Sequence, residues 1–135
     1  MAEIEMYNPP GLAKPVGPYS HIATAKNTKL VFIAGQVAVD AGGRLVGEGD
    51  FAKQCGQVFA NLETGLKAAG ASWANVVQSI TYIVRASDIA GLYEWRLREF
   101  PKMFAGNRFP PNTLLVIDRL VNEKYLIEIQ AIAAV

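Results

Sequence analysis

The sequence predicts an α+β domain in which two helices cover one face of a mostly antiparallel sheet. Segments 50–70 and 87–104 carry apolar residues at helical spacing, whereas the other apolar segments are short and rich in β-branched residues. The 135 residues are 51% hydrophobic and 19% charged, which is typical of one compact domain spanning 1–135. Several strands are apolar on both faces, and two helices can cover only one face. We therefore expect self-association through the sheet.

The first third of the chain is expected to form three strands and one long loop. Residues 2–8 suit a short edge strand, and residues 8–20 hold four prolines, so that segment is irregular. Strands are expected at 19–25 and 30–39. The second of these is apolar on both faces, as in a central strand buried from two sides. Gly35 within it indicates a bulge or a close approach by another group.

The first helix has clear end signals. Asp50 is a suitable N-cap and Gly70 suits the C′ position. Cys55 lies on the apolar face of this helix and is expected to be an inert core residue. After a turn begun by Ser72, an alternating strand is expected at 76–85.

The second helix is predicted to start after Ser87, its expected N-cap. Pro101 lies within the helical pattern, so we expect a kink or a break near Phe100. The residues along one side of this helix are Ile89, Leu92, Tyr93, Arg96, Phe100, Met103 and Phe104.

The C-terminal segment gives the strongest strand signal. Strands are expected at 113–117 and 125–133, and Pro110 and Pro111 restrict strand pairing to the residues after them. This loop is expected to hold Asn112 at the mouth of a strand. In the last strand, period-two geometry places Leu126, Glu128, Gln130 and Ile132 on one face. If Gln130 is buried, its amide needs hydrogen-bond partners, and a solvent-facing glutamine is the alternative.

Composition limits the classes of partner. The net charge of +1 and the absence of a basic run make nucleic acid an unexpected partner. The single cysteine favours a reducing compartment. The N-terminus resembles no secretory signal, and no stretch approaches the roughly 20 apolar residues of a membrane span, so a cytoplasmic protein without a membrane segment is expected. No Cys/His cluster suits a metal and no Gly-rich loop suits a phosphate cofactor.

Several short motifs together resemble the RidA family, also called the YjgF or L-PSP endoribonuclease family. They occur in that family's order, with near-family spacing over nearly the whole chain: Gly17-Pro18-Tyr19-Ser20, Ala34-Gly35-Gln36, Asn61-Leu62, Ala68-Ala69-Gly70, Phe109-Pro110, Arg119-Leu120 and Ile127-Glu128-Ile129-Gln130-Ala131-Ile132-Ala133. The resemblance implies a chorismate-mutase-like fold and a homotrimer with clefts between its subunits. It also implies hydrolysis of enamines or imines to a 2-keto acid and ammonia.

The same resemblance implies a set of site residues, most of which differ here. The family's carboxylate-binding arginine corresponds to Asn112, its water-activating glutamate to Gln130, and its pocket serine to Ala34. The position of a frequent cysteine is Leu114. Tyr19 is retained, as is the backbone of Gly35. An arginine binds carboxylates through charge-assisted hydrogen bonds, which an asparagine cannot provide, and Gln130 cannot act as a general base. The substituted site therefore suits a neutral polar ligand.

Three charged or titrating residues near these positions are candidates for compensation. Arg108 precedes Asn112 by four residues, although a solvated loop arginine is the alternative. Glu128 shares the face of Gln130, about 7 Å along the strand, and suits either a shifted site or a structural ion pair. His21 shares the face of Tyr19 if both lie in a strand, and it suits either a catalytic or a hydrogen-bonded surface role.

Three functions follow as hypotheses. The first is a divergent hydrolase that acts on an imine, an enamine or a related C–N compound at a subunit interface. The second is a trimer that binds a small metabolite without catalysis. The third, an endoribonuclease or translation inhibitor, is the least favoured because no basic and aromatic surface stripe is visible.

Overall fold

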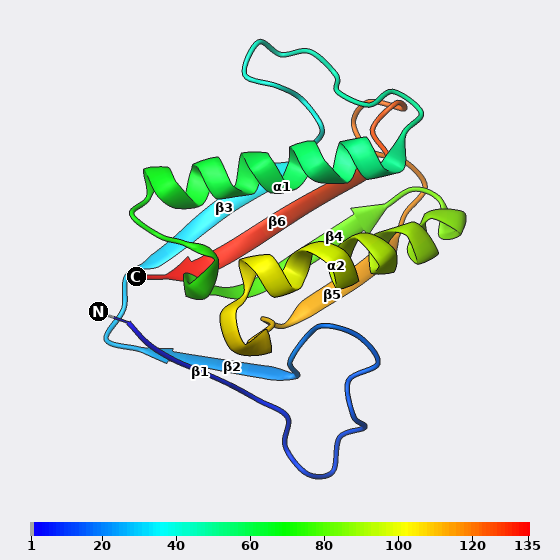
Figure 1. The fold of residues 1–135 in the computed structure, drawn as a ribbon. Coiled ribbons are helices and arrows are strands. Elements are labelled where there is room, and N and C mark those ends of the chain that lie inside the picture. The colour runs from blue at the N-terminus through cyan, green and yellow to red at the C-terminus, as the bar shows by residue number, and fades with distance from the viewer. Residues whose placement is uncertain (1) are drawn as a thin grey trace.

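Two helices pack on one face of a four-stranded sheet, and a separate two-stranded sheet lies beside it (Figure 1). The computed structural model describes residues 2–135. The helices are α1 (Phe51–Ala68) and α2 (Ile89–Met103). The strands are β1 (Glu3–Tyr7), β2 (Ile22–Lys26), β3 (Leu30–Gln36), β4 (Val76–Ile83), β5 (Asn112–Val116) and β6 (Ile127–Ala134). The predicted α+β class with two helices on one face is therefore confirmed.

The main sheet has the order β3-β6-β4-β5. It is antiparallel except between β4 and β5, which run parallel. The last strand therefore lies in the interior of the sheet, and β3 forms one edge. The prediction of 30–39 as a central strand is wrong. Its apolar outward residues are instead exposed in the single subunit, and Phe32 is 71% exposed.

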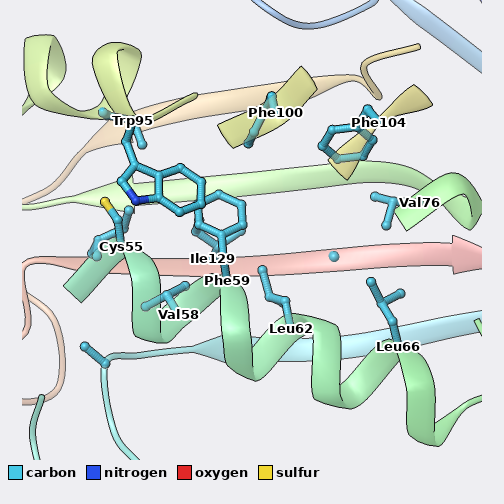
Figure 2. Packing of buried hydrophobic residues seen from close by; sticks show 14 of the residues in the cluster. Cys55, Val58, Phe59, Leu62, Leu66, Val76, Trp95, Phe100, Phe104 and Ile129 are labelled. Carbon is cyan, nitrogen blue, oxygen red and sulfur yellow. The ribbon is translucent and has the colours of Figure 1, made fainter. Parts of the chain in front are cut away.

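The aromatic layer between the sheet and the helices forms the centre of the core (Figure 2). The Phe59 ring of α1 stacks on Trp95 of α2 with a centroid distance of 4.3 Å, and it meets the Phe100 ring edge-on at 5.7 Å. Such pairs each add about 0.5–1.5 kcal/mol beyond the effect of area burial. Cys55 is fully buried in this layer, as its position in the helical pattern indicates. These contacts hold the two helices against each other, and Ile129 of β6 belongs to the same buried cluster.

The ends of the two helices test the capping residues that the sequence predicts. Asp50 accepts a hydrogen bond from the Lys53 backbone N–H at 3.1 Å, and Gly70 has a φ of +73°, so both predicted ends of α1 are confirmed. The predicted cap of α2 is wrong. Ser87 lies inside a short 3-10 turn and the N-cap residue is Asp88, whose carboxylate bonds Arg85 at 2.7 Å.

Several predicted boundaries shift by a few residues. Helix α2 continues through Pro101 to Met103, so the expected break at Phe100 does not occur. Pro101 lacks only its own N–H, so one helical hydrogen bond is lost, while Phe104 still donates to the Phe100 carbonyl at 2.8 Å. The strands predicted at 19–25, 30–39 and 76–85 are shorter, and they are β2, β3 and β4 with the bounds given above.

Two amide side chains of α1, the buried Gln54 and the partly buried Asn61, hold the loops next to the sheet. Gln54 of α1 donates to the carbonyl oxygens of Gly47 and Lys124 and accepts from the Leu126 N–H, so its hydrogen-bonding groups are occupied. Asn61 donates to the carbonyl oxygens of Val37 and Val39, after β3. The entry to β6 and the exit from β3 are thereby fixed to the same helix. Over residues 2–135, neither helix is long and apolar enough to cross a membrane.

Candidate functional site

The face of the sheet that points away from the helices, called the open face below, carries a group of polar side chains. The register pairs Gln130 with Ile80 and Glu128 with Tyr82, so these four residues project from the same face. Their neighbours in β6, among them Ile127 and Ile129, are buried against the helices, which confirms the alternation predicted for this strand. The open face is therefore the polar side of β6.

Gln130 has one hydrogen-bond partner on this face. The Tyr82 hydroxyl donates to Gln130 Oε1 at 2.9 Å. This bond fixes the orientation of the amide and presents its nitrogen as a donor. Within residues 2–135, that nitrogen has no hydrogen-bond acceptor. The side chain can therefore donate to a bound molecule or to water, but it cannot accept a proton.

Glu128 lies against the backbone of Gly35. A Cβ atom at position 35 would stand only 2.8 Å from Glu128 Cδ and 2.9 Å from Cγ, so a side chain there would displace the carboxylate. The pairing of β3 with β6 is interrupted between Ile33 and Gln36, and the predicted bulge and close approach at Gly35 are both confirmed. The Ala34 carbonyl in this bulge accepts from Gln36 Nε2 at 3.0 Å.

The carboxylate of Glu128 is not used in an ion pair. Among residues 2–135, no lysine, arginine or histidine nitrogen lies within 4.0 Å of its oxygens. The structural ion pair considered for Glu128 is therefore absent from the described part of the chain. A partly buried carboxylate beside an amide donor is a suitable base for a proton from water.

Asn112 projects from the opposite face. It pairs with Ser79, the neighbour of Ile80, so its side chain points toward the helices while Gln130 points away from them. Its Nδ2 donates to Ser79 Oγ at 2.9 Å and to Thr81 Oγ1 at 3.0 Å. The expected slot between subunits, lined by both residues, stays a prediction, but within a single subunit Asn112 and Gln130 do not share a face. The reason is the register of β5 beside β4, which the sequence pattern does not define.

Leu114 follows Asn112 on the helix-facing side of β5. It pairs with the buried Thr81 and packs against the hydrophobic core. Within one subunit, Leu114 is therefore separated by the sheet from Glu128 and Gln130.

Arg96 is the polar residue that the sequence reasoning missed. It is only 4% exposed, and its Nη2 donates to Thr81 Oγ1 at 2.9 Å and to Asn112 Oδ1 at 3.1 Å. Its guanidinium carbon lies 5.5 Å from the centre of the Phe100 ring. Burial lowers the pKa of Arg96 to about 10. The available signal was an arginine within an otherwise apolar helical row.

Tyr19 and His21 lie in the loop before β2 and not in the strand, which begins at Ile22. Their rings meet edge-on with centroids 5.6 Å apart. The His21 N–H donates to Asn8 Oδ1 at 2.8 Å, and His21 Nε2 lies 2.6 Å from the Ala13 carbonyl oxygen. His21 therefore links separate parts of the proline-rich loop through hydrogen bonds, which agrees with the hydrogen-bonded surface role considered above.

Tyr19 lines a hollow of about 670 Å³ that is separate from the Glu128 group. Its wall is formed by the proline-rich loop together with Asn107 and Phe109. Ser20 closes this loop onto the rest of the subunit, because its hydroxyl donates to the Phe109 carbonyl at 2.6 Å. Arg108 is directed elsewhere, since its Nη2 donates to the Ile4 carbonyl of β1 at 2.8 Å.

A single subunit thus divides the predicted site residues among three places. Glu128, Gln130 and Gly35 lie together on the open face, Tyr19 and His21 lie in the proline-rich loop, and Asn112 and Leu114 lie on the helix side. Within residues 2–135, no three His, Cys, Asp or Glu side chains are grouped closely enough to hold a metal ion.

Comparison with known proteins identifies the class to which this fold belongs. The Rid family protein YyfB of Yersinia pestis, a protein of unknown function, superimposes with a TM-score of 0.86 at 33% identity, covering 98% of both chains. RidA from an Antarctic Psychrobacter superimposes with a TM-score of 0.68 at 27% identity, covering 90% of this chain and 92% of that one. The subunit therefore has the α+β architecture of Rid proteins.

The sequence comparisons establish the family. Residues 11–135 match the family model described as endoribonuclease L-PSP. A RutC family protein of Pyrococcus horikoshii is 34% identical over 120 residues, covering 89% of each chain. The human 2-iminobutanoate/2-iminopropanoate deaminase is 29% identical over 119 residues, covering 87% of this chain and 80% of the human protein. The chain belongs to the RidA (YjgF, L-PSP endoribonuclease) family.

Proposed function

We propose that this protein hydrolyses the C=N bond of a small imine, or of the imine tautomer of an enamine, on the open face of its sheet. The observation that carries the proposal is the position of Glu128, whose carboxylate lies over Gly35 and shares its face with Gln130. The human deaminase among the relatives acts on 2-imino acids, by its name. The chemistry proposed here is of the same class.

The reaction needs one general base and one hydrogen-bond donor. Water adds to the imine carbon while Glu128 accepts a proton from that water, and Glu128 passes this proton to the nitrogen as the C=N double bond becomes single. Collapse of the resulting carbinolamine releases ammonia and leaves a carbonyl compound. The amide nitrogen of Gln130 donates a hydrogen bond that orients the water or the substrate.

The charge of this face selects the substrate. Glu128 contributes a negative charge, and Gln130 and Tyr82 are neutral, so a carboxylate beside them would be repelled. An iminium ion, by contrast, gains from a nearby carboxylate. We therefore propose a neutral or cationic imine as the substrate, in place of the anionic 2-imino acids of the deaminase relatives.

A neighbouring copy of the chain is proposed to complete the site. Phe32 is 71% exposed and Leu115 42% exposed on the open face of the isolated subunit, and apolar residues exposed together favour an interface. A homotrimer that buries these residues would enclose the Glu128 group in clefts between subunits. Enclosure would exclude bulk water and strengthen the electrostatic effect of the carboxylate.

A pair of matched substrates tests the proposal. We would generate 2-iminopropanoate and its neutral amide, 2-iminopropanamide, in situ by elimination from the corresponding N-chloroamines, and measure ammonia release. We expect acceleration over buffer for the amide and little for the carboxylate. Glu128→Gln should lower the rate with the amide by about 100-fold or more. The exposed Glu123→Gln variant serves as the control and should retain the rate. No acceleration of the amide, or full activity in Glu128→Gln, would refute the proposal.

Binding without catalysis is the second candidate, and the neutral amide of Gln130 favours it. It predicts that a neutral polar metabolite raises the melting temperature of the wild type but not of Gln130→Ala, with no product formed. An RNA-directed activity has less support at a net charge of +1. Salt-sensitive binding of a labelled single-stranded RNA would restore it.

A further inference from the structure

A small cavity lies on the helix side of the sheet, opposite the proposed catalytic face. Its volume is about 20 Å³, which is enough for one water-sized or halide-sized species and too small for a metabolite. Most of its wall is apolar and includes the aromatic rings of Phe59, Phe100 and Phe104. Its polar part is formed by Arg96, Ser79, Thr81 and Asn112.

The polar groups of this wall offer donors and few acceptors. Asn112 Oδ1 accepts from Arg96, and the Asn112 amide hydrogens go to Ser79 Oγ and Thr81 Oγ1. Thr81 Oγ1 also accepts from Arg96 Nη2, so both of its lone pairs are occupied. The hydroxyl hydrogens of Ser79 and Thr81 have no acceptor within residues 2–135, nor does Arg96 Nε, which is buried. Three donors therefore remain without a protein partner.

In the part of the chain that the structure describes, the one charged group in the cavity wall, Arg96, is positive and therefore also favours an anion. Arg96 is 4% exposed and forms no ion pair with a carboxylate among residues 2–135. A buried charge without a counter-charge is costly, and a second charge of opposite sign at short range reduces that cost.

We propose that this cavity binds a single monatomic anion of the size of chloride. Arg96 Nε and the Ser79 and Thr81 hydroxyls are its donors. A water molecule would satisfy the same donors, but its own two hydrogens would meet few acceptors in this wall. The anion neutralises Arg96 and so stabilises the network that holds β5 against β4.

The proposal goes beyond the proposed enzymatic function and is tested without an activity measurement. Crystals grown in sodium bromide should show an anomalous peak within about 3.5 Å of Arg96 Nε, the ordinary range for a halide beside an N–H donor. The melting temperature should rise with chloride or bromide to a plateau, measured against sodium gluconate at equal ionic strength.

Two aspartate variants separate a specific anion from a general salt effect. Asn112→Asp places a carboxylate oxygen beside Arg96 and should abolish the halide-dependent shift, because it supplies the counter-charge internally. Thr113→Asp adds the same charge on the opposite face and should keep the shift. Water density without an anomalous signal, equal melting in chloride and gluconate, or an undiminished halide shift in Asn112→Asp would each overturn the proposal.

Discussion

Placing an arginine at position 112, where the resemblance to the family predicts one, should destabilise this protein strongly. Asn112 Oδ1 lies 3.1 Å from Arg96 Nη2, so a guanidinium at 112 would stand on the order of 5 Å from the Arg96 charge. At an effective dielectric constant of about 20, that repulsion amounts to about 3 kcal/mol. The lost hydrogen bonds to Ser79 and Thr81 add about 1 kcal/mol each. We expect Asn112→Arg to lower the free energy of unfolding by about 3–5 kcal/mol, since partial exposure relieves some of the repulsion.

The exchange of both residues should restore much of this loss. In the double variant Arg96→Asn/Asn112→Arg only one guanidinium remains, so the repulsion disappears and the double-mutant cycle should give a coupling of about 2–3 kcal/mol. The assay is urea unfolding at a fixed subunit concentration, because any self-association makes stability depend on concentration. Arg98 lies on the same helix with a side chain 57% exposed, and Arg98→Asn combined with Asn112→Arg should show no coupling. A coupling below about 0.5 kcal/mol for Arg96 would contradict the charge argument.

Three further predictions concern other parts of the molecule. Gly35→Ala should displace the Glu128 carboxylate and lower the rate of the proposed imine hydrolysis at least about 10-fold. At Gly56, by contrast, an added Cβ meets no atom within 4 Å, so Gly56→Ala should raise the free energy of unfolding by about 0.5–1 kcal/mol in a urea titration. Burial raises the pKa of the Cys55 thiol from 9.0 to about 12, so the unfolded chain loses this proton at a lower pH than the folded protein. The free energy of unfolding should therefore fall above pH 9, by about 1.4 kcal/mol at pH 10. This loss of stability should be absent from Cys55→Ala when unfolding is compared at pH 8 and pH 10. Phe32→Lys should dissociate the proposed trimer in sedimentation velocity, and an unchanged sedimentation coefficient would exclude the open face as the interface.

Local signals in the sequence were sufficient where a single segment determines its own structure. The ends of α1 follow from Asp50 and Gly70, because a side-chain cap and a positive φ depend only on neighbouring residues. The alternation of β6 follows from its period of two, and it separates the buried Ile129 from Glu128 and Gln130. The close approach at Gly35 was also indicated, although the sequence did not identify Glu128 as the group that approaches.

The pairing of strands that are distant in the sequence could not be predicted from local signals. The apolar segment 30–39 resembled a central strand because an apolar edge strand and a buried central strand have the same composition. The parallel placement of β5 beside β4 decides which face Asn112 occupies, and no property of residues 110–117 encodes it. Arg96 was assigned to an apolar helical row, because no local pattern indicates that Thr81 and Asn112 accept hydrogen bonds from its guanidinium.

The sequence alone was sufficient for the family and the two helices, and its resemblance to the family predicts that Asn112 and Gln130 stand in the positions of an arginine and a glutamate. The fold was needed to establish that these two positions lie on opposite faces of the sheet in one subunit, that Glu128 lies over Gly35, and that a buried arginine lies behind Asn112. Side-chain identity is a property of each residue, whereas a shared face or a hydrogen bond depends on strand register and helix packing, which the whole chain sets together.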